Sequence, residues 1–158
     1  MGIYALLLAR SHFRGGGQDL HELAAGFFLH DIGKAEINPA LLNKRGRFTE
    51  AERLEMRAHV PHGERLVAQA GGLEAASAIV AQHHERVDGR GYPRGLRDGE
   101  IHPSALICGL ADVYDALTST RPYKVSLSPF EALSTIRREM VGPVNLPLFE
   151  CFVRLLYD

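Results

Sequence analysis

Apolar residues recur three and four positions apart along most of this chain, and no stretch alternates apolar and polar residues as a half-buried strand does. The clearest example is the segment 18–32, whose apolar positions at helical spacing are Leu20, Leu23, Ala24, Phe27 and Phe28. Clusters of glycine and proline interrupt this pattern, the first being Gly15-Gly16-Gly17. The sequence therefore predicts an all-α bundle of about six to seven helices.

Capping residues indicate where several of these helices begin. Residues 49–52 form a capping box that opens a helix, and His59 is expected late in that helix, just before Pro61. A further helix is predicted over about 73–86. The glycines and the proline of 87–100 permit no regular element, so this segment is predicted to be a long functional loop.

Three more helices are predicted to begin in the last third of the chain. Pro103 fits the first turn of a long helix reaching about Thr118, residues 128–131 cap another, and Pro147 introduces a final one. With 158 residues and 46% hydrophobic content, the chain is long enough for one substantial core and short for two. A single domain over 1–158 is expected.

Side chains that can bind metal gather in the middle of the chain, partly in adjacent pairs. They are His30, Asp31, His59, His83, His84 and Asp112. Neutral imidazole and carboxylate suit zinc, manganese or iron, and one carboxylate can bridge two cations about 3.5–4 Å apart. Asp31 is the natural bridge. His30 and Asp112 would then serve one metal, and the other three histidines the second.

Each part of this set also has an ordinary structural explanation. A lone His59 is more often a surface or a hydrogen-bonded core histidine than a ligand. Neighbours such as His83 and His84 point about 100° apart on a helix and need not converge. The combination favours the metal site. Lys34 shares a helical face with His30 and Asp31, and a cation beside a metal pair indicates an anionic substrate, most simply a phosphate.

Four motifs in order resemble the HD-GYP domain, a branch of the HD phosphohydrolase superfamily. They read HDIGK at 30–34, HHERVDGRGYP at 83–93, ADVYDALTS at 111–119 and RPYK at 121–124. The likeness runs from about Tyr4 to the C-terminus, and the four segments together are far more specific than a bare His-Asp dyad.

This resemblance implies an all-helical, metal-dependent phosphodiesterase that hydrolyses cyclic di-GMP to the linear dinucleotide or to GMP. It places the six residues above on the family's metal ligands and implies two divalent ions, with iron or manganese favoured and zinc or nickel possible. Asp31 and Lys34 are expected to be catalytic. The residues implied to contact substrate are Lys34, Tyr92, Arg121 and Lys124. The Gly91-Tyr92-Pro93 loop is also implicated in contacts with GGDEF-type partner domains.

One departure from the family pattern concerns the first helix. The family carries a further histidine ligand, and in some members a glutamate, at a position upstream of Met1. The first helix is therefore expected to be incomplete, and this chain to be weakly active or inactive. His12 and His21 are poor substitutes, because His12 lies at the far end of the first helix and His21 on the opposite side of the second.

Charge and cysteine content limit the environment and the partners. A formal net charge of −1 argues against broad attraction to nucleic-acid polymers or membranes. The opening segment IYALLLA is too short to span a bilayer and lacks a basic start. Cys108 and Cys151 are far apart and form no Cys-x-x-Cys motif, so a reduced, cytoplasmic protein is expected.

Two other functions remain open. The chain could be a signalling module that binds metal and a partner but turns over poorly, or a different HD-type phosphohydrolase that acts on a nucleoside phosphate. The glycine-tyrosine-proline signature speaks against the second. Glu85 and Asp88 are expected either to orient the histidines or to cap the loop that follows them.

Overall fold

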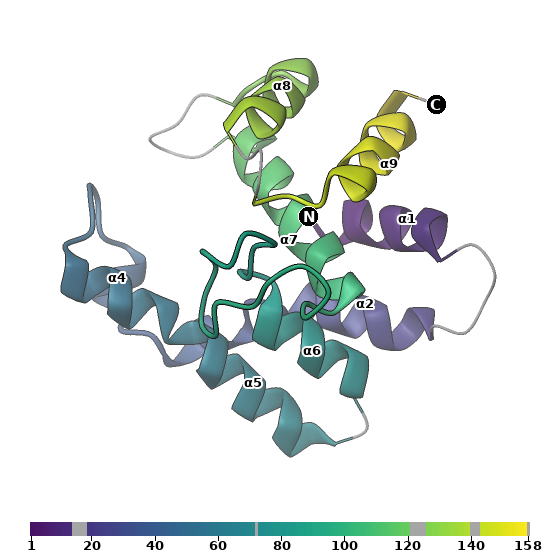
Figure 1. Ribbon diagram of the computed structural model, residues 1–158. Coiled ribbons are helices and arrows are strands. Elements are labelled where there is room, and N and C mark those ends of the chain that lie inside the picture. The colour runs from purple at the N-terminus through teal and green to yellow at the C-terminus, as the bar shows by residue number, and fades with distance from the viewer. Residues whose placement is uncertain (14–18, 72, 121–125, 140–142, 158) are drawn as a thin grey trace.

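The computed structural model describes residues 1–13, 19–71, 73–120, 126–139 and 143–157, and the architecture over these ranges is helical (Figure 1). The elements are α1 (Gly2–His12), α2 (Leu20–Leu29), a 3-10 helix η1 (Ile32–Glu36), α3 (Pro39–Leu42), α4 (Glu50–Arg57), α5 (His59–Ala70), α6 (Glu74–Gln82), α7 (Pro103–Thr118), α8 (Pro129–Glu139) and α9 (Leu146–Tyr157). The all-α prediction is confirmed. Among the described residues, no helix is both long and apolar enough to cross a membrane.

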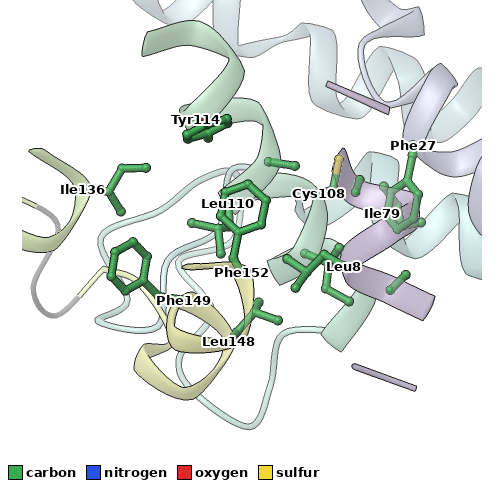
Figure 2. Close-up of a cluster of buried hydrophobic side chains, with 14 of the residues drawn as sticks. Leu8, Phe27, Ile79, Cys108, Leu110, Tyr114, Ile136, Leu148, Phe149 and Phe152 are labelled. Atoms are coloured by element: carbon green, nitrogen blue, oxygen red, sulfur yellow. The ribbon is translucent and has the colours of Figure 1, made fainter. Parts of the chain in front are cut away.

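The main hydrophobic core surrounds α7, which runs through the middle of the molecule and packs against α1, α6 and α8 (Figure 1). Its buried side chains come mostly from α1, α7, α8 and α9, and Figure 2 shows Leu8, Cys108, Ile136 and Phe152 among them. The side of α7 that faces this cluster is apolar, with Ile107, Leu110 and Tyr114 buried on it, which accounts for the central place of this helix.

A second layer consists of α2, α5 and α6, with η1 packed on α5. Close approach of α2 and α6 requires a small residue, because a Cβ on Gly26 would lie 2.8 Å from the Cα of Ala76. Val67, Ala76 and Val80 form a small apolar cluster between α5 and α6. This layer brings the end of α2, the start of α5 and the end of α6 together.

Several predicted boundaries agree with the structure. α7 covers Pro103–Thr118 as expected. The capping box at Thr49 and Glu52 forms at the start of α4. Ser128 and Glu131 exchange the same pair of hydrogen bonds ahead of α8. These starts were predictable because each cap involves residues only three positions apart.

Other boundaries differ from the prediction. α4 ends at Arg57, and His59 begins α5 rather than lying late in the preceding helix. Pro61 does not stop a helix here, because it lies in the first turn of α5, where its missing N–H has no intrahelical partner to lose. This break and the short α3 raise the count in the described chain to nine α-helices, above the predicted six to seven. α6 also ends at Gln82, before the two histidines.

Candidate metal centre

Four of the predicted ligands converge on one point. Asp31, His59, His83 and His84 each offer a ligand atom, and these atoms all lie within 4.8 Å of one another. The Oδ1 atom of Asp31 is 3.3 Å from Nε2 of His59 and 3.9 Å from Nε2 of His83. Residues far apart in sequence thus place three imidazoles around one carboxylate.

His30 and Asp112 lie on the other side of Asp31. Nε2 of His30 is 3.4 Å from Oδ2 of Asp31 and 3.9 Å from Oδ1 of Asp112. The two oxygens of Asp31 therefore face two different groups of donors. That is the arrangement that a bridging carboxylate needs.

Backbone hydrogen bonds fix which nitrogen of three histidines faces the centre. In His30, Nδ1 lies 2.9 Å from the carbonyl oxygen of Phe27. In His59, it lies 2.7 Å from the carbonyl oxygen of Met56, and in His83 it lies 3.0 Å from that of Val80. Because a carbonyl oxygen only accepts, Nδ1 carries the hydrogen in each ring. Nε2 is then a lone pair directed at the centre, ready to bind a cation.

Buried polar atoms without partners also mark this centre. The described chain has five buried side-chain polar atoms without a hydrogen-bond partner, and four are Nε2 of His30, His59 and His83 and Oδ1 of Asp31. Leaving one such group unpaired costs about 1–3 kcal/mol. Nε2 of His59 and His83 and Oδ1 of Asp31 meet at one point and fit a metal ion, whereas Nε2 of His30 faces the second donor group, beside Oδ2 of Asp31.

The charges at the centre suit cation binding. Burial raises the pKa of Asp31, but its close contacts with His30 and Lys34 outweigh this effect and hold the pKa well below its usual range. Burial lowers the pKa of His83 to about 3 and that of His84 to about 2, and neighbouring histidines add to both shifts. Carboxylate and neutral imidazole are the forms that bind metal.

Glycines allow the helices that carry these ligands to approach. A Cβ on Gly33 would lie 1.9 Å from the carbonyl oxygen of His59 and 2.4 Å from the backbone nitrogen of Gly63. A Cβ on Gly109 would lie 2.5 Å from the carbonyl oxygen of His83. Because these positions have no side chain, the backbone of η1 directly contacts the backbone of α5. In the same way, the backbone of α7 contacts the backbone at the end of α6.

The loop after the histidines folds back over them. The buried carboxylate of Glu85 accepts hydrogen bonds from the backbone N–H of Arg94, at 2.6 Å, and of Leu96, at 2.9 Å. Asp88 accepts from the N–H of Arg90. Of the two roles open from the sequence, both residues therefore cap the loop. The ring of Tyr92 stacks on that of His84, with centroids 4.6 Å apart.

The remaining predicted residues are placed as follows. Lys34 donates to Oδ2 of Asp31 at 2.5 Å, so it lies beside the centre. Arg121 and Lys124 fall outside the described residues. His12 and His21 are exposed.

Two arginines were missed from the sequence. Arg86 donates to the carbonyl oxygens of His83, at 3.1 Å, and Glu85, at 2.8 Å, so it holds the turn that carries the histidines. Arg57 lies over the ring of Tyr92. The sequence signal for Arg86 was its place three residues after a ligand, at the end of a helix where a cation is favourable.

Comparison with known families decides the classification. The family model for the HD domain matches residues 14–141, most of the chain. The chain belongs to the HD-GYP family. This HD-GYP domain is 39% identical over 130 residues to a cyclic di-GMP phosphodiesterase of Thermotoga maritima, covering 80% of this chain and 35% of that protein.

Two further relatives have related activities. A cyclic di-GMP phosphodiesterase of Pseudomonas aeruginosa is 37% identical over 136 residues, covering 85% of this chain and 33% of that protein. A 3′3′-cGAMP-specific phosphodiesterase of Vibrio cholerae is 34% identical over 127 residues, covering 80% of this chain and 27% of that protein. The HD-GYP domain thus spans 27% to 35% of the length of these three relatives.

A solved structure gives the same fold. An HDG"Y"P protein of Bdellovibrio bacteriovorus superposes with a TM-score of 0.80 over 99% of this chain and 50% of that one, at 21% identity. At this identity the likeness establishes the fold alone, and it agrees with the helical bundle described above.

Proposed function

We propose that this HD-GYP domain is a metal-dependent phosphodiesterase that hydrolyses cyclic di-GMP to the linear dinucleotide or to GMP. The observation that carries the proposal is the convergence of unpaired Nε2 and Oδ1 atoms around Asp31, with Lys34 beside them. The activities named for the Thermotoga and Pseudomonas relatives indicate the substrate.

The donor set divides between two cation positions. His59, His83 and His84 with Oδ1 of Asp31 would hold one divalent ion, and His30 and Asp112 with Oδ2 of Asp31 the other. Iron or manganese suits this mixture of imidazole and carboxylate, and zinc or nickel is also compatible. Bound there, such ions supply a hydroxide near neutral pH and neutralise charge on the phosphate oxygens.

The chain's own residues would orient and complete the site. Asp31 fixes the two donor groups relative to each other, because each of its oxygens faces one group. Lys34 would contribute a positive charge beside the phosphate and stabilise the additional negative charge that develops during hydrolysis. Arg121 and Lys124 are proposed to contact the phosphate from the RPYK motif.

A second candidate substrate is 3′3′-cGAMP, the substrate in the name of the Vibrio cholerae relative. It has the same two phosphodiesters and differs in one base. Side-by-side assays of the two cyclic dinucleotides therefore decide between them.

The test uses this chain purified, loaded with Fe(II) or Mn(II) and incubated with each cyclic dinucleotide, with products separated by chromatography. We expect weak hydrolysis that Asp31→Asn abolishes and that His21→Ala, an exposed histidine away from the centre, leaves unchanged. Metal binding with no turnover of either compound would favour the signalling module. Preferential hydrolysis of nucleoside monophosphate esters would favour the different HD-type phosphohydrolase.

Contact of the Gly91-Tyr92-Pro93 loop with a GGDEF-type domain stays a prediction. Pro93 and Arg94 are exposed on this loop, whereas Tyr92 is half-buried against His84. A partner would therefore meet the two exposed residues. Tyr92 faces the metal centre.

A further inference from the structure

Arg57 is an exposed cation close to the metal centre that the core does not explain. It is the last residue of α4, and it precedes the predicted ligand His59 by two positions. α4 has no buried residue, and it lies at the edge of the molecule in Figure 1. Burial of apolar surface therefore gives no reason for the position of this side chain.

The side chain of Arg57 is nevertheless directed at the site. Its Cζ atom lies over the ring of Tyr92, 4.8 Å from the ring centre, within the range of a cation–π interaction. The same ring stacks on His84, at an interplanar angle of 25°. A cation is thus joined to the metal centre through one aromatic ring.

Other cations near the centre already have partners, which for Arg86 are the backbone carbonyl oxygens of His83 and Glu85. Lys34 is bound to Asp31 at 2.5 Å, and Arg94 to Glu64 at 2.5 Å. In the described part of the chain, no carboxylate forms an ion pair with Arg57. Its positive charge is therefore available to an anionic ligand at the edge of the site.

We propose that Arg57 binds the second phosphodiester of a cyclic dinucleotide, the one that is not being hydrolysed. This inference rests on the proposed function, in which the reacting phosphate lies beside Asp31 and Lys34. A cyclic dinucleotide has two phosphodiesters on opposite sides of one ring. A cation set back from the reacting centre matches the second.

The chemistry of arginine favours this role. A guanidinium fork donates two parallel hydrogen bonds to phosphate, and lysine cannot reproduce that geometry. Contact with the ring of Tyr92 restricts the guanidinium before substrate arrives, which reduces the entropy lost on binding. Arg57 would therefore act on substrate affinity, and the centre itself would not depend on it.

The experiment compares three variants with the wild-type chain. Arg57→Met removes the charge and keeps an unbranched apolar stem. Arg57→Lys keeps the charge and loses the fork. Arg53→Met is the matched control, because Arg53 is an exposed arginine on the same helix that is paired with Glu50.

Three substrates separate the possible contacts. Cyclic di-GMP has two phosphodiesters, the dinucleotide GpG has one phosphodiester with both guanines, and bis(p-nitrophenyl) phosphate has one phosphodiester and no base. We expect Arg57→Met to raise KM for cyclic di-GMP about 10-fold or more, as loss of a charged hydrogen bond predicts. The KM of Arg57→Lys for cyclic di-GMP should lie between those of the wild type and Arg57→Met, and the KM of Arg53→Met should equal that of the wild type.

The other two substrates and the metal content should change less than about twofold in Arg57→Met. Equal losses on all three substrates, or loss of metal, would mean that Arg57 acts through Tyr92 on the centre and would overturn the proposal. Losses on cyclic di-GMP and GpG alone would assign a guanine contact instead. Unchanged KM for cyclic di-GMP would also overturn it.

The wild-type chain distinguishes failure of the proposed function. If it hydrolyses bis(p-nitrophenyl) phosphate but neither hydrolyses nor binds cyclic di-GMP or 3′3′-cGAMP, the proposed substrate class is wrong, and the role of Arg57 falls with it. If the wild type is active on a cyclic dinucleotide and Arg57→Met is equally active, the proposed function holds and this inference alone fails.

Discussion

At the scale of single residues, the centre depends on the orientation of its imidazoles. His30, His59 and His83 each direct Nδ1 at the carbonyl oxygen three residues earlier in the chain. This contact fixes both the tautomer and the orientation of each ring before a cation binds. The rings therefore lose little conformational freedom when the cation binds. Asp31 lies between these rings, with Oδ1 near His59 and His83 and Oδ2 near His30 and Lys34.

A first prediction concerns the bridging role of Asp31. Asp31→Ala should lower metal occupancy at both positions, because its two oxygens face both donor groups. His59→Ala should spare the position served by His30 and Asp112. Metal content per chain, measured by elemental analysis after reconstitution with Mn(II), checks this. Equal losses in the two variants would contradict the bridge.

A second prediction concerns the RPYK motif. Arg121→Ala should raise KM or lower kcat for cyclic di-GMP and leave metal content intact, because an arginine is not a ligand but can bind phosphate. Steady-state kinetics and elemental analysis on the same preparation measure both quantities. Loss of metal in this variant would assign Arg121 a structural role.

At the scale of elements, contacts between backbones position the ligands. η1 follows Asp31 directly and packs on α5, which begins with His59. The contact is possible because Gly33 has no side chain at the point where a Cβ would meet the His59 carbonyl. This packing brings Asp31 and His59 together.

A third prediction tests this contact. Gly33→Ala should destabilise the fold by about 3 kcal/mol, because the added Cβ meets backbone atoms that cannot rotate away. The control is Gly2→Ala, whose nearest neighbour atoms belong to the ring of the exposed Phe28, a side chain that can rotate away. Urea denaturation followed by circular dichroism measures both. Similar stabilities for the two variants would refute the packing argument.

At the scale of the whole molecule, the metal centre lies where the helical layers meet. Its donors come from the end of α2, the start of α5, the end of α6 and the middle of α7. Both the main core around α7 and the layer of α2, α5 and α6 thus contribute donor residues to the centre. A cation that joins ligands from both should therefore stabilise the complete fold.

A fourth prediction follows for metal removal. At a free metal concentration about 100 times Kd, binding adds about 2.7 kcal/mol to stability, which corresponds to a rise in Tm of about 5–10 °C for a chain of this size. Calorimetry with and without chelator should show this difference in the wild type. Asp31→Ala should lose most of it. An unchanged Tm on chelation of a fully loaded protein would contradict the prediction.

The sequence by itself determined the helical class and several boundaries, and it indicated which side chains are candidates to bind metal. The span Pro103–Thr118 and the caps at Thr49 and Ser128 were predictable because periodicity and capping act over a few residues. The four motifs indicated the family before any distance was known, and the HD-domain family model together with the curated relatives confirms it.

Tertiary structure decided how these parts meet. That His59 begins a helix, that Gly33 contacts α5, and that Arg57 lies over Tyr92 were not visible in the sequence. Each of these features depends on packing between segments that are far apart in the chain. Local propensity carries no information about such contacts, because they form only when the apolar faces of separate helices are buried together.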